Sequence, residues 1–187
     1  MQSKRNETAL SGASRNATRA LEALSSPELT HVPDDEKTAW AMAALIHCDL
    51  CRLVVTLDEC HVEGLARLLC LSDIASKLFE ARNWYNNSGA KLLRTIAARK
   101  SFGLARTNER MESLKSTHQI HRVNKYEPYR NKFGYHYDTD AIGHLQQFGR
   151  EDADQFFELL TSFVRFSGEW AKLTKELVGS ENCEANA

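Results

Sequence analysis

Long apolar runs are missing from this 187-residue chain. No stretch approaches the roughly 20 consecutive apolar residues that a helix needs to cross a bilayer. Basic residues near the N-terminus are not followed by an apolar segment, which argues against a secretory signal. Neither sign of charge is in large excess, because the formal net charge is -1. We therefore expect a cytoplasmic protein with no membrane partner.

Several enzyme motifs are absent as well. The chain has no P-loop, dinucleotide-binding fingerprint, nucleophile elbow or zinc-protease motif. No window shows the two-residue alternation of a β-strand, whereas apolar residues recur at helical spacing. The pattern predicts an all-α bundle of four to five main helices with a flexible N-terminal arm.

The expected domain organisation follows from shifts in composition. Residues 1–33 are rich in Ser, Asn, Thr and Ala and predict the flexible arm, in which a short helix is possible. Residues 34–180 predict the bundle, and residues 181–187 predict a disordered tail. Within the bundle we expect helices from Asp34 to beyond Val55, from Asp58 to Asn86, over 90–100, over 108–125 and from Glu151 to Val178.

Helix boundaries are predicted from capping and breaking residues. Asp34-Asp35-Glu36 suits a helix N-terminus, Thr107 suits a cap, and Asn86-Asn87-Ser88-Gly89 suits a break. Proline fits only the first turn of a helix, so Glu127-Pro128 interrupts one helix or begins another. The expected inward residues of the second helix are Val62, Leu65, Leu69, Ile74, Leu78 and Phe79. Those of the last helix are Phe156, Leu159, Leu160, Phe163, Val164 and Trp170.

Five cysteines, an odd number, indicate free thiols in a reducing compartment. Four of them (Cys48, Cys51, Cys60 and Cys70) lie in helical sequence. Together with His47 and His61 they resemble part of a zinc site, but no second Cys-x-x-Cys or His-x-x-x-His completes the ligand set. We therefore expect these cysteines to pack as small hydrophobic residues, with no metal and no cofactor. The tryptophans Trp40, Trp84 and Trp170 are expected to be packing anchors.

The net charge conceals a strong asymmetry. Residues 91–132 hold eleven basic and three acidic residues, whereas residues 133–187 hold four and ten. A concentrated basic stretch is typical of proteins that bind the nucleic-acid backbone. The candidate RNA-binding residues are Lys91, Arg94, Arg99, Lys100, Arg106, Arg110, Arg122, Lys125 and Lys132. The alternative is a solvated basic face, including His118 and His121, that pairs with the acidic C-terminal helix.

The basic stretch ends at Arg130-Asn131-Lys132-Phe133-Gly134-Tyr135-His136. Cleavage of RNA by its own 2′-hydroxyl needs a proton acceptor, a proton donor and positive charge on the phosphate. Histidine exchanges protons near pH 7, and arginine binds phosphate oxygens through its planar fork. We therefore assign Arg130, Asn131 and His136 as candidate catalytic residues that need no metal. Tyr129, Tyr135 and Tyr137 are candidate supporting residues.

Helix geometry complicates this assignment. Six residues of an ideal helix leave Arg130 and His136 about 120° apart and roughly 9 Å apart along the axis. The arginine must therefore reach around the helix, the helix must bend near Gly134, or two copies of the segment must meet across a two-fold axis.

The Arg-polar-x4-His pattern, followed by Tyr137-Asp138, resembles the HEPN (higher eukaryotes and prokaryotes nucleotide-binding) family, particularly its abortive-infection-like branch. The resemblance covers about nine specific residues and the helical layout of residues 35–178. It implies a metal-independent endoribonuclease that works as a homodimer, with both motifs lining one cleft. It also implies a toxin or phage-defence role with a possible antitoxin partner. One departure from the family pattern is Gly134, which lies inside the motif and weakens a helix relative to alanine.

A non-catalytic alternative remains open. In it, the protein is a helical adaptor whose 91–132 stretch binds RNA or an acidic protein, and His136 is structural. A metal-binding protein built on the cysteines is a third, less favoured interpretation.

Overall fold

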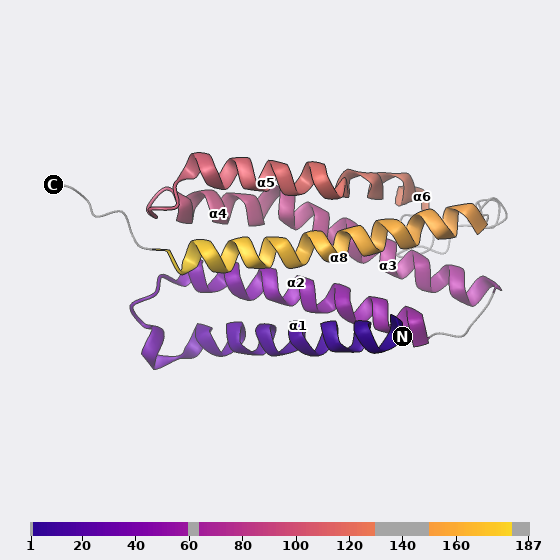
Figure 1. Ribbon diagram of the computed structural model, residues 1–187, viewed down its shortest axis with the longest axis horizontal. Helices are drawn as coiled ribbons and strands as arrows, with labels where there is room; N and C mark the ends of the chain where they lie inside the picture. The colour runs from indigo at the N-terminus through magenta and orange to yellow at the C-terminus, as the bar shows by residue number, and fades with distance from the viewer. Residues whose placement is uncertain (1, 60–63, 130–149, 181–187) are drawn as a thin grey trace.

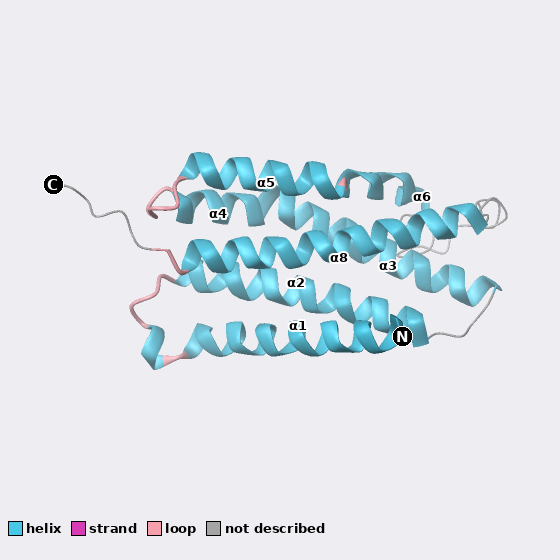
Figure 2. Cartoon of the chain, in the orientation of Figure 1, coloured by secondary structure: helices cyan, strands magenta, loops and turns pink. Residues whose placement is uncertain are grey.

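The computed structural model of the chain describes residues 2–59, 64–129 and 150–180. Figure 2 shows helices joined by short loops, and these ranges contain no strand. The all-α bundle predicted from the sequence is confirmed. Its α-helices are α1 (Gln2–Ser25), α2 (Asp34–Glu59), α3 (Gly64–Trp84), α4 (Ala90–Ala97), α5 (Leu104–His118), α6 (Glu127–Tyr129) and α8 (Arg150–Val178).

Helix α8 lies at the centre of the bundle (Figure 1). It packs against α2 on one side and against α4 and α5 on the other, whereas α1 lies on the outer side of α2. Two 3₁₀ segments, η1 (Pro27–Leu29) and η3 (Ile120–Tyr126), and one π-helical turn, η2 (Tyr85–Gly89), complete the described chain.

The core is built around the aromatic side chains of α8. The predicted inward residues Phe156, Leu159, Leu160, Phe163 and Trp170 are all buried, and Val164 is partly buried. Tyr85 enters this cluster from η2, with its ring centroid 4.8 Å from that of Phe166 and 5.0 Å from that of Trp170. Both ring pairs are edge-to-face, the arrangement that the ring quadrupoles favour.

The inward residues predicted for α3 are only partly correct. Ile74, Leu78 and Phe79 are buried, but Leu69 is 37% exposed. Helix α3 begins at Gly64, and its first turns lie at the end of the bundle (Figure 1), where fewer helices cover them. The predicted positions of Val62 and Leu65 lie outside the described side chains.

The predicted flexible arm is wrong, because residues 2–25 form helix α1. Its buried face consists of Ala13, Ala17, Ala20 and Ala23, which recur at helical spacing. Ala17 and Ala20 pack against Ala41 and Ala44 of α2, with Trp40 and Cys48 at the margin. Alanine has the highest helix propensity, but its small side chain gives a weak hydrophobic pattern among polar residues.

The predicted break at residues 86–89 is also wrong. Helix α3, the π-helical turn η2 and α4 follow one another without a loop, and the chain keeps its direction through them. Asn87 accepts a hydrogen bond from the backbone N–H of Ala90. Gly89 permits this path because the Trp84 ring packs directly over it. Polar residues and glycine suggest a loop in sequence, yet here they form one widened helical turn.

Replacing Gly89 with alanine should destabilise the bundle. A Cβ at this position would lie 2.7 Å from the Trp84 ring, closer than van der Waals contact allows. The ring must then leave its position against Tyr85, and overpacking of this kind costs about 1–3 kcal/mol. Urea unfolding of G89A measures the loss, with Gly12→Ala as control because no atom lies within 4 Å of a Cβ there. Equal stability of the two variants would contradict the tight contact.

The single helix predicted over 108–125 is two segments. Helix α5 begins at Leu104, after Gly103 with a φ of 82°, so Thr107 lies inside the helix and is not its cap. Its hydroxyl donates a hydrogen bond to the Gly103 carbonyl at 2.9 Å. Gln119 adopts a left-handed φ of 47°, which ends α5 and starts η3. Helix α6 then begins at Glu127, as Pro128 predicted.

Helix α2 begins at the acidic residues that predicted its N-terminus. The most apolar 18-residue window of its segment Asp34–Asp58 has a mean hydropathy of 1.5, so by length and composition alone the helix is long and apolar enough to span a membrane. Asp49 and Arg52 lie within this segment, so it is not the run of about 20 consecutive apolar residues considered above. A core helix passes the same test, and 44% of this window is buried inside the bundle, where α1 and α8 pack on α2.

Candidate functional site

The candidate catalytic segment lies outside the described residues. This applies to Arg130, Asn131 and His136, and also to Lys132, Tyr135 and Tyr137. The chain enters the segment from α6, whose last residue is Tyr129, and leaves it into α8 at Arg150. The described site therefore consists of the basic residues that precede the motif and the polar groups inside the bundle.

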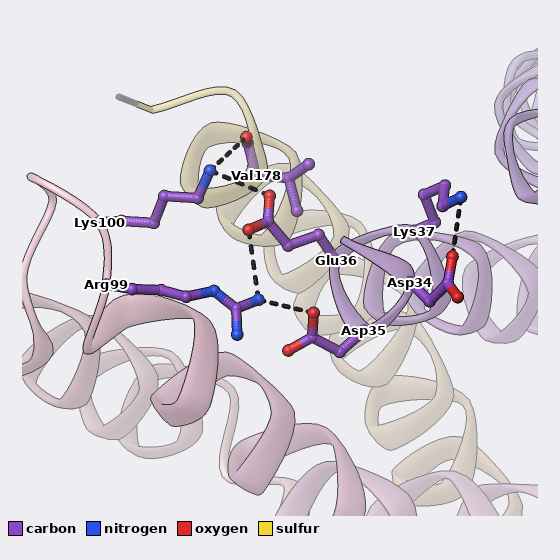
Figure 3. A network of polar contacts seen from close by, with 7 residues as sticks. All are labelled: Asp34, Asp35, Glu36, Lys37, Arg99, Lys100 and Val178. Carbon is purple, nitrogen blue, oxygen red and sulfur yellow. Dashed lines mark hydrogen bonds and ion pairs between the residues drawn. The ribbon is translucent and has the colours of Figure 1, made fainter. Parts of the chain in front are cut away.

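Two of the candidate RNA-binding residues belong to a network of ion pairs (Figure 3). Lys100 is 6% exposed, and its Nζ lies 3.0 Å from Glu36 Oε2. The same Nζ donates to the backbone carbonyl of Val178, 3.4 Å away, at the end of α8. Arg99 Nη2 donates to Asp35 Oδ1 at 2.6 Å and to Glu36 Oε1 at 3.3 Å. The network joins the start of α2 to the ends of α4 and α8.

Two further basic residues also have carboxylate partners. Arg110 Nη1 lies 3.3 Å from Glu176 Oε2 on α8. Lys115 Nζ lies 3.2 Å from Glu112 Oε1, three residues earlier on α5. Of these four, Arg110 pairs with the acidic C-terminal helix as the alternative predicted, whereas Arg99 and Lys100 pair with α2 and Lys115 pairs within α5.

Four candidates have no carboxylate partner among the described residues: Lys91, Arg94, Arg106 and Arg122. All four are exposed. Arg94 Nε donates to Asn108 Oδ1 at 2.9 Å, and Arg106 stacks over the Phe102 ring with its guanidinium carbon 4.4 Å from the centroid. Lys125, also exposed, donates to Gln155 Oε1 on α8.

The two histidines of the basic stretch differ. His121 is exposed, as a member of a basic face would be. His118 is buried instead, with Nε2 3.3 Å from Glu169 Oε1 and its ring against Phe166. The expectation that His118 belongs to the exposed face is therefore wrong. His118 is the last residue of α5, and its ring points toward α8.

A polar cluster inside the bundle was not anticipated from the sequence. His47 Nδ1 lies 2.8 Å from Ser167 Oγ, which donates its proton to the Val164 carbonyl at 2.8 Å. The serine proton is thus engaged, so His47 Nδ1–H must donate to Ser167, and Nε2 carries the lone pair. Cys51 Sγ lies 3.8 Å from that Nε2. Ser167 is fully buried and hydrogen-bonded, which suits a structural role.

Tyr85 lies beside this cluster. Its side chain is fully buried, and burial raises the pKa of its phenol, which keeps the hydroxyl protonated. Ser167 is close to the phenol, although Tyr85 Oη makes no hydrogen bond of normal geometry. We therefore assign Tyr85 to the core and not to proton transfer.

His47 predicts a pH dependence of stability. Burial lowers the pKa of His47 below its ordinary value of 6.5. At a pH between the lowered pKa of the folded state and 6.5, the unfolded chain binds a proton at His47 and the folded chain does not. The contribution of neutral His47 to stability is therefore complete above pH 6.5 and is lost as the pH falls below it. Urea unfolding at pH 7.5 and 5.5 should show a smaller pH effect in His47→Gln than in the original protein. Equal pH effects would exclude this role for His47.

The cysteines that resembled a metal site are free thiols where the structure describes them. Cys51 is buried, and burial raises the pKa of its thiol to about 11. Over residues 2–59, 64–129 and 150–180, no three His, Cys, Asp or Glu side chains gather as metal ligands would. Cys60 and His61 lie outside these ranges.

Comparison with known proteins adds no relative, since no family model, curated protein or solved structure matches this chain. The HEPN resemblance therefore depends on the residues from Arg130 to Asp138 and on the helical layout.

Proposed function

We propose that this protein is a metal-independent endoribonuclease of HEPN type. The observation that carries the proposal is the pattern Arg130-Asn131-x4-His136 in an all-α bundle, directly after a basic stretch. The 2′-oxygen attacks the adjacent phosphorus, the bond from phosphorus to the 5′-oxygen breaks, and the products are a 2′,3′-cyclic phosphate and a 5′-hydroxyl.

Each motif residue has a role in this reaction. His136 moves the proton, from the 2′-hydroxyl or to the departing 5′-oxygen. Arg130 binds the phosphoryl oxygens as negative charge accumulates on them. Asn131 orients the phosphate or the histidine. A homodimer supplies a second copy of the motif, so that one histidine acts as base and the other as acid. A toxin or phage-defence role in the cytoplasm, with an antitoxin as partner, follows from the same resemblance.

The ion pairs of the bundle narrow the proposed RNA-binding surface. Arg99, Lys100 and Arg110 already meet carboxylates, so their charge is largely compensated before RNA arrives. The exposed residues Lys91, Arg94, Arg106, Arg122 and Lys125 remain candidates. Lys132, which lies within the motif and outside the described residues, stays a candidate from sequence. Phosphate contacts of this kind supply affinity that does not depend on sequence.

The second candidate function is a non-catalytic adaptor. The exposed cations Lys91, Arg94, Arg106 and Arg122 favour it to the same degree, because they can bind RNA or an acidic protein whether or not His136 acts.

Cleavage of end-labelled RNA by the purified protein in EDTA tests the proposal. We expect fragments that end in a 2′,3′-cyclic phosphate. Binding without cleavage, with an affinity that falls steeply as salt increases, would support the adaptor. Cleavage that disappears in EDTA would contradict the metal-independent mechanism.

A further inference from the structure

Exposed leucines gather on the hairpin that α1 and α2 form. Five large hydrophobic side chains are exposed in the described ranges, and three of them belong to this hairpin: Leu21 and Leu24 of α1 and Leu45 of α2. The other two, Leu69 and Leu104, lie singly on α3 and α5. Single exposed leucines are ordinary on a protein surface, whereas a group of them indicates a surface that binds a partner.

The alanine contact between α1 and α2 places these leucines together. The two helices lie side by side and run in opposite directions (Figure 1). Leu21 follows the buried Ala20 by one residue, and Leu45 follows the buried Ala44 by one residue. In two antiparallel helices, an equal displacement from the line of contact leads to the same flank. Leu21 and Leu45 therefore face solvent on one side of the hairpin.

The α2 part of this flank has no charge over three turns. Residues 38–48 contain no Asp, Glu, Lys or Arg, although Thr38 and Leu45 are exposed and Met42 between them is half-buried. These three positions recur at helical spacing, so they share one face of α2. Less than half (44%) of the most apolar window of α2 is buried inside the bundle. We call the resulting surface the leucine patch, which consists of Leu21, Leu24, Met42 and Leu45.

Charge around the leucine patch is mostly negative. Residues 20–49 hold six Asp or Glu residues but one basic residue, Lys37. Asp35 and Glu36 point into the ion-pair network of Figure 3. Glu22 and Glu28 are exposed and have no ion pair among the described residues. A second copy of the chain would bring like charges together at this patch, which opposes self-association, whereas a basic partner would be attracted.

We propose that the leucine patch binds an amphipathic helix of a partner protein, with large apolar residues on one face and Lys or Arg beside them. The apolar face packs on Leu21, Leu24 and Leu45, and the cations lie toward the carboxylates around the patch. The end of α1 and the start of α2 lie at the opposite end of the bundle from α6 (Figure 1). The patch is therefore separate from the entry to the candidate catalytic segment, and the proposal does not depend on RNA cleavage.

Fluorescence anisotropy with a labelled model peptide tests the site. The peptide contains only leucine and lysine, has its leucines on one helical face, and is about 15 residues long because shorter helices are marginal in water. We expect Leu21→Gln/Leu45→Gln to weaken binding about tenfold, since two anchoring side chains lose their apolar contact. The matched control is Leu69→Gln/Leu104→Gln, which changes the exposed leucines outside the hairpin and should leave binding unchanged. Equal losses in both double variants, or no binding by the original protein, would overturn the site.

A second peptide, with glutamate in place of each lysine, tests the charge of the partner. It should bind at least about tenfold more weakly than the lysine peptide at low salt, because it repels the carboxylates around the patch. The difference should shrink as salt screens these exposed charges. Equal binding of the two peptides at low salt would contradict a basic partner.

Analytical ultracentrifugation of the protein alone tests the competing occupant. Self-association that disappears in Leu21→Gln/Leu45→Gln would assign the patch to a second copy of the chain and overturn the partner helix. Urea unfolding should give equal stabilities for the two double variants, since glutamine has a high helix propensity and these positions are exposed. RNA cleavage should be the same in both variants, so failure of this site and failure of the proposed nuclease are distinguishable.

Discussion

Replacing His136 with alanine should lower the rate of RNA cleavage by at least about a hundredfold. A positioned acid or base contributes roughly 10² to 10⁴ in rate, and alanine cannot carry the proton. Arg130→Ala should cause a comparable loss, since it removes the charge that stabilises the phosphoryl oxygens. Single-turnover cleavage in EDTA measures both effects.

His121→Ala is the control for the loss of a histidine from this part of the chain. His121 is exposed on η3 and has no role in the proposed reaction, so cleavage should be unchanged. Urea unfolding of each variant separates a chemical effect from a loss of folding. Cleavage by the Arg130→Ala/His136→Ala double variant at the original rate would exclude the motif as the active site.

Replacing Glu36 with alanine should cost about 3–5 kcal/mol of unfolding free energy, the range for breaking one side of a buried ion pair. Glu36 is 1% exposed and compensates Lys100, which is 6% exposed. Without this carboxylate, the one polar partner that Lys100 keeps among the described residues is the Val178 carbonyl at 3.4 Å. Arg99 retains Asp35, so the penalty falls mainly on Lys100 (Figure 3). Urea unfolding at pH 7 measures the loss.

Asp34→Ala is the matched control, two residues away on the same turn of α2. Asp34 pairs with Lys37 at 2.8 Å, but its side chain is 95% exposed, so its loss should lower stability far less than the loss of Glu36, mainly through the helix N-terminus. Glu36→Leu/Lys100→Met should recover most of the lost stability, because an apolar pair needs no charge compensation. A Glu36→Ala variant as stable as Asp34→Ala would show that the network contributes nothing.

The fold was largely predictable where large apolar residues repeat every three to four positions. Helix α8 was predicted from Glu151 and begins at Arg150, because its phenylalanines and leucines mark one face clearly. Helix α1 was missed because its buried face contains only alanines at the core positions. The π turn between α3 and α4 was missed because its asparagines, serine and glycine resemble a loop in sequence.

The site was less predictable, because its contacts join residues far apart in the chain. Arg99 meets Asp35 across 64 residues, and His47 meets Ser167 across 120. Charge counting indicated that the basic stretch had either acidic partners or RNA to bind. In the sequence, Lys100 and Lys91 look alike. The packing of α2, α4 and α8 buries Lys100 and leaves Lys91 exposed.

The alanine contact between α1 and α2 has a consequence for motion. Leu21 and Leu24 of α1 remain 43% and 42% exposed, so mainly methyl groups hold this helix to the bundle. A buried CH₂-sized group contributes about 0.8 kcal/mol, which is little against the entropy of ordering 24 residues. Amide hydrogens of α1 should therefore exchange with deuterium well before those of α8. Exchange would occur when α1 transiently detaches from α2 while the remaining helices stay folded.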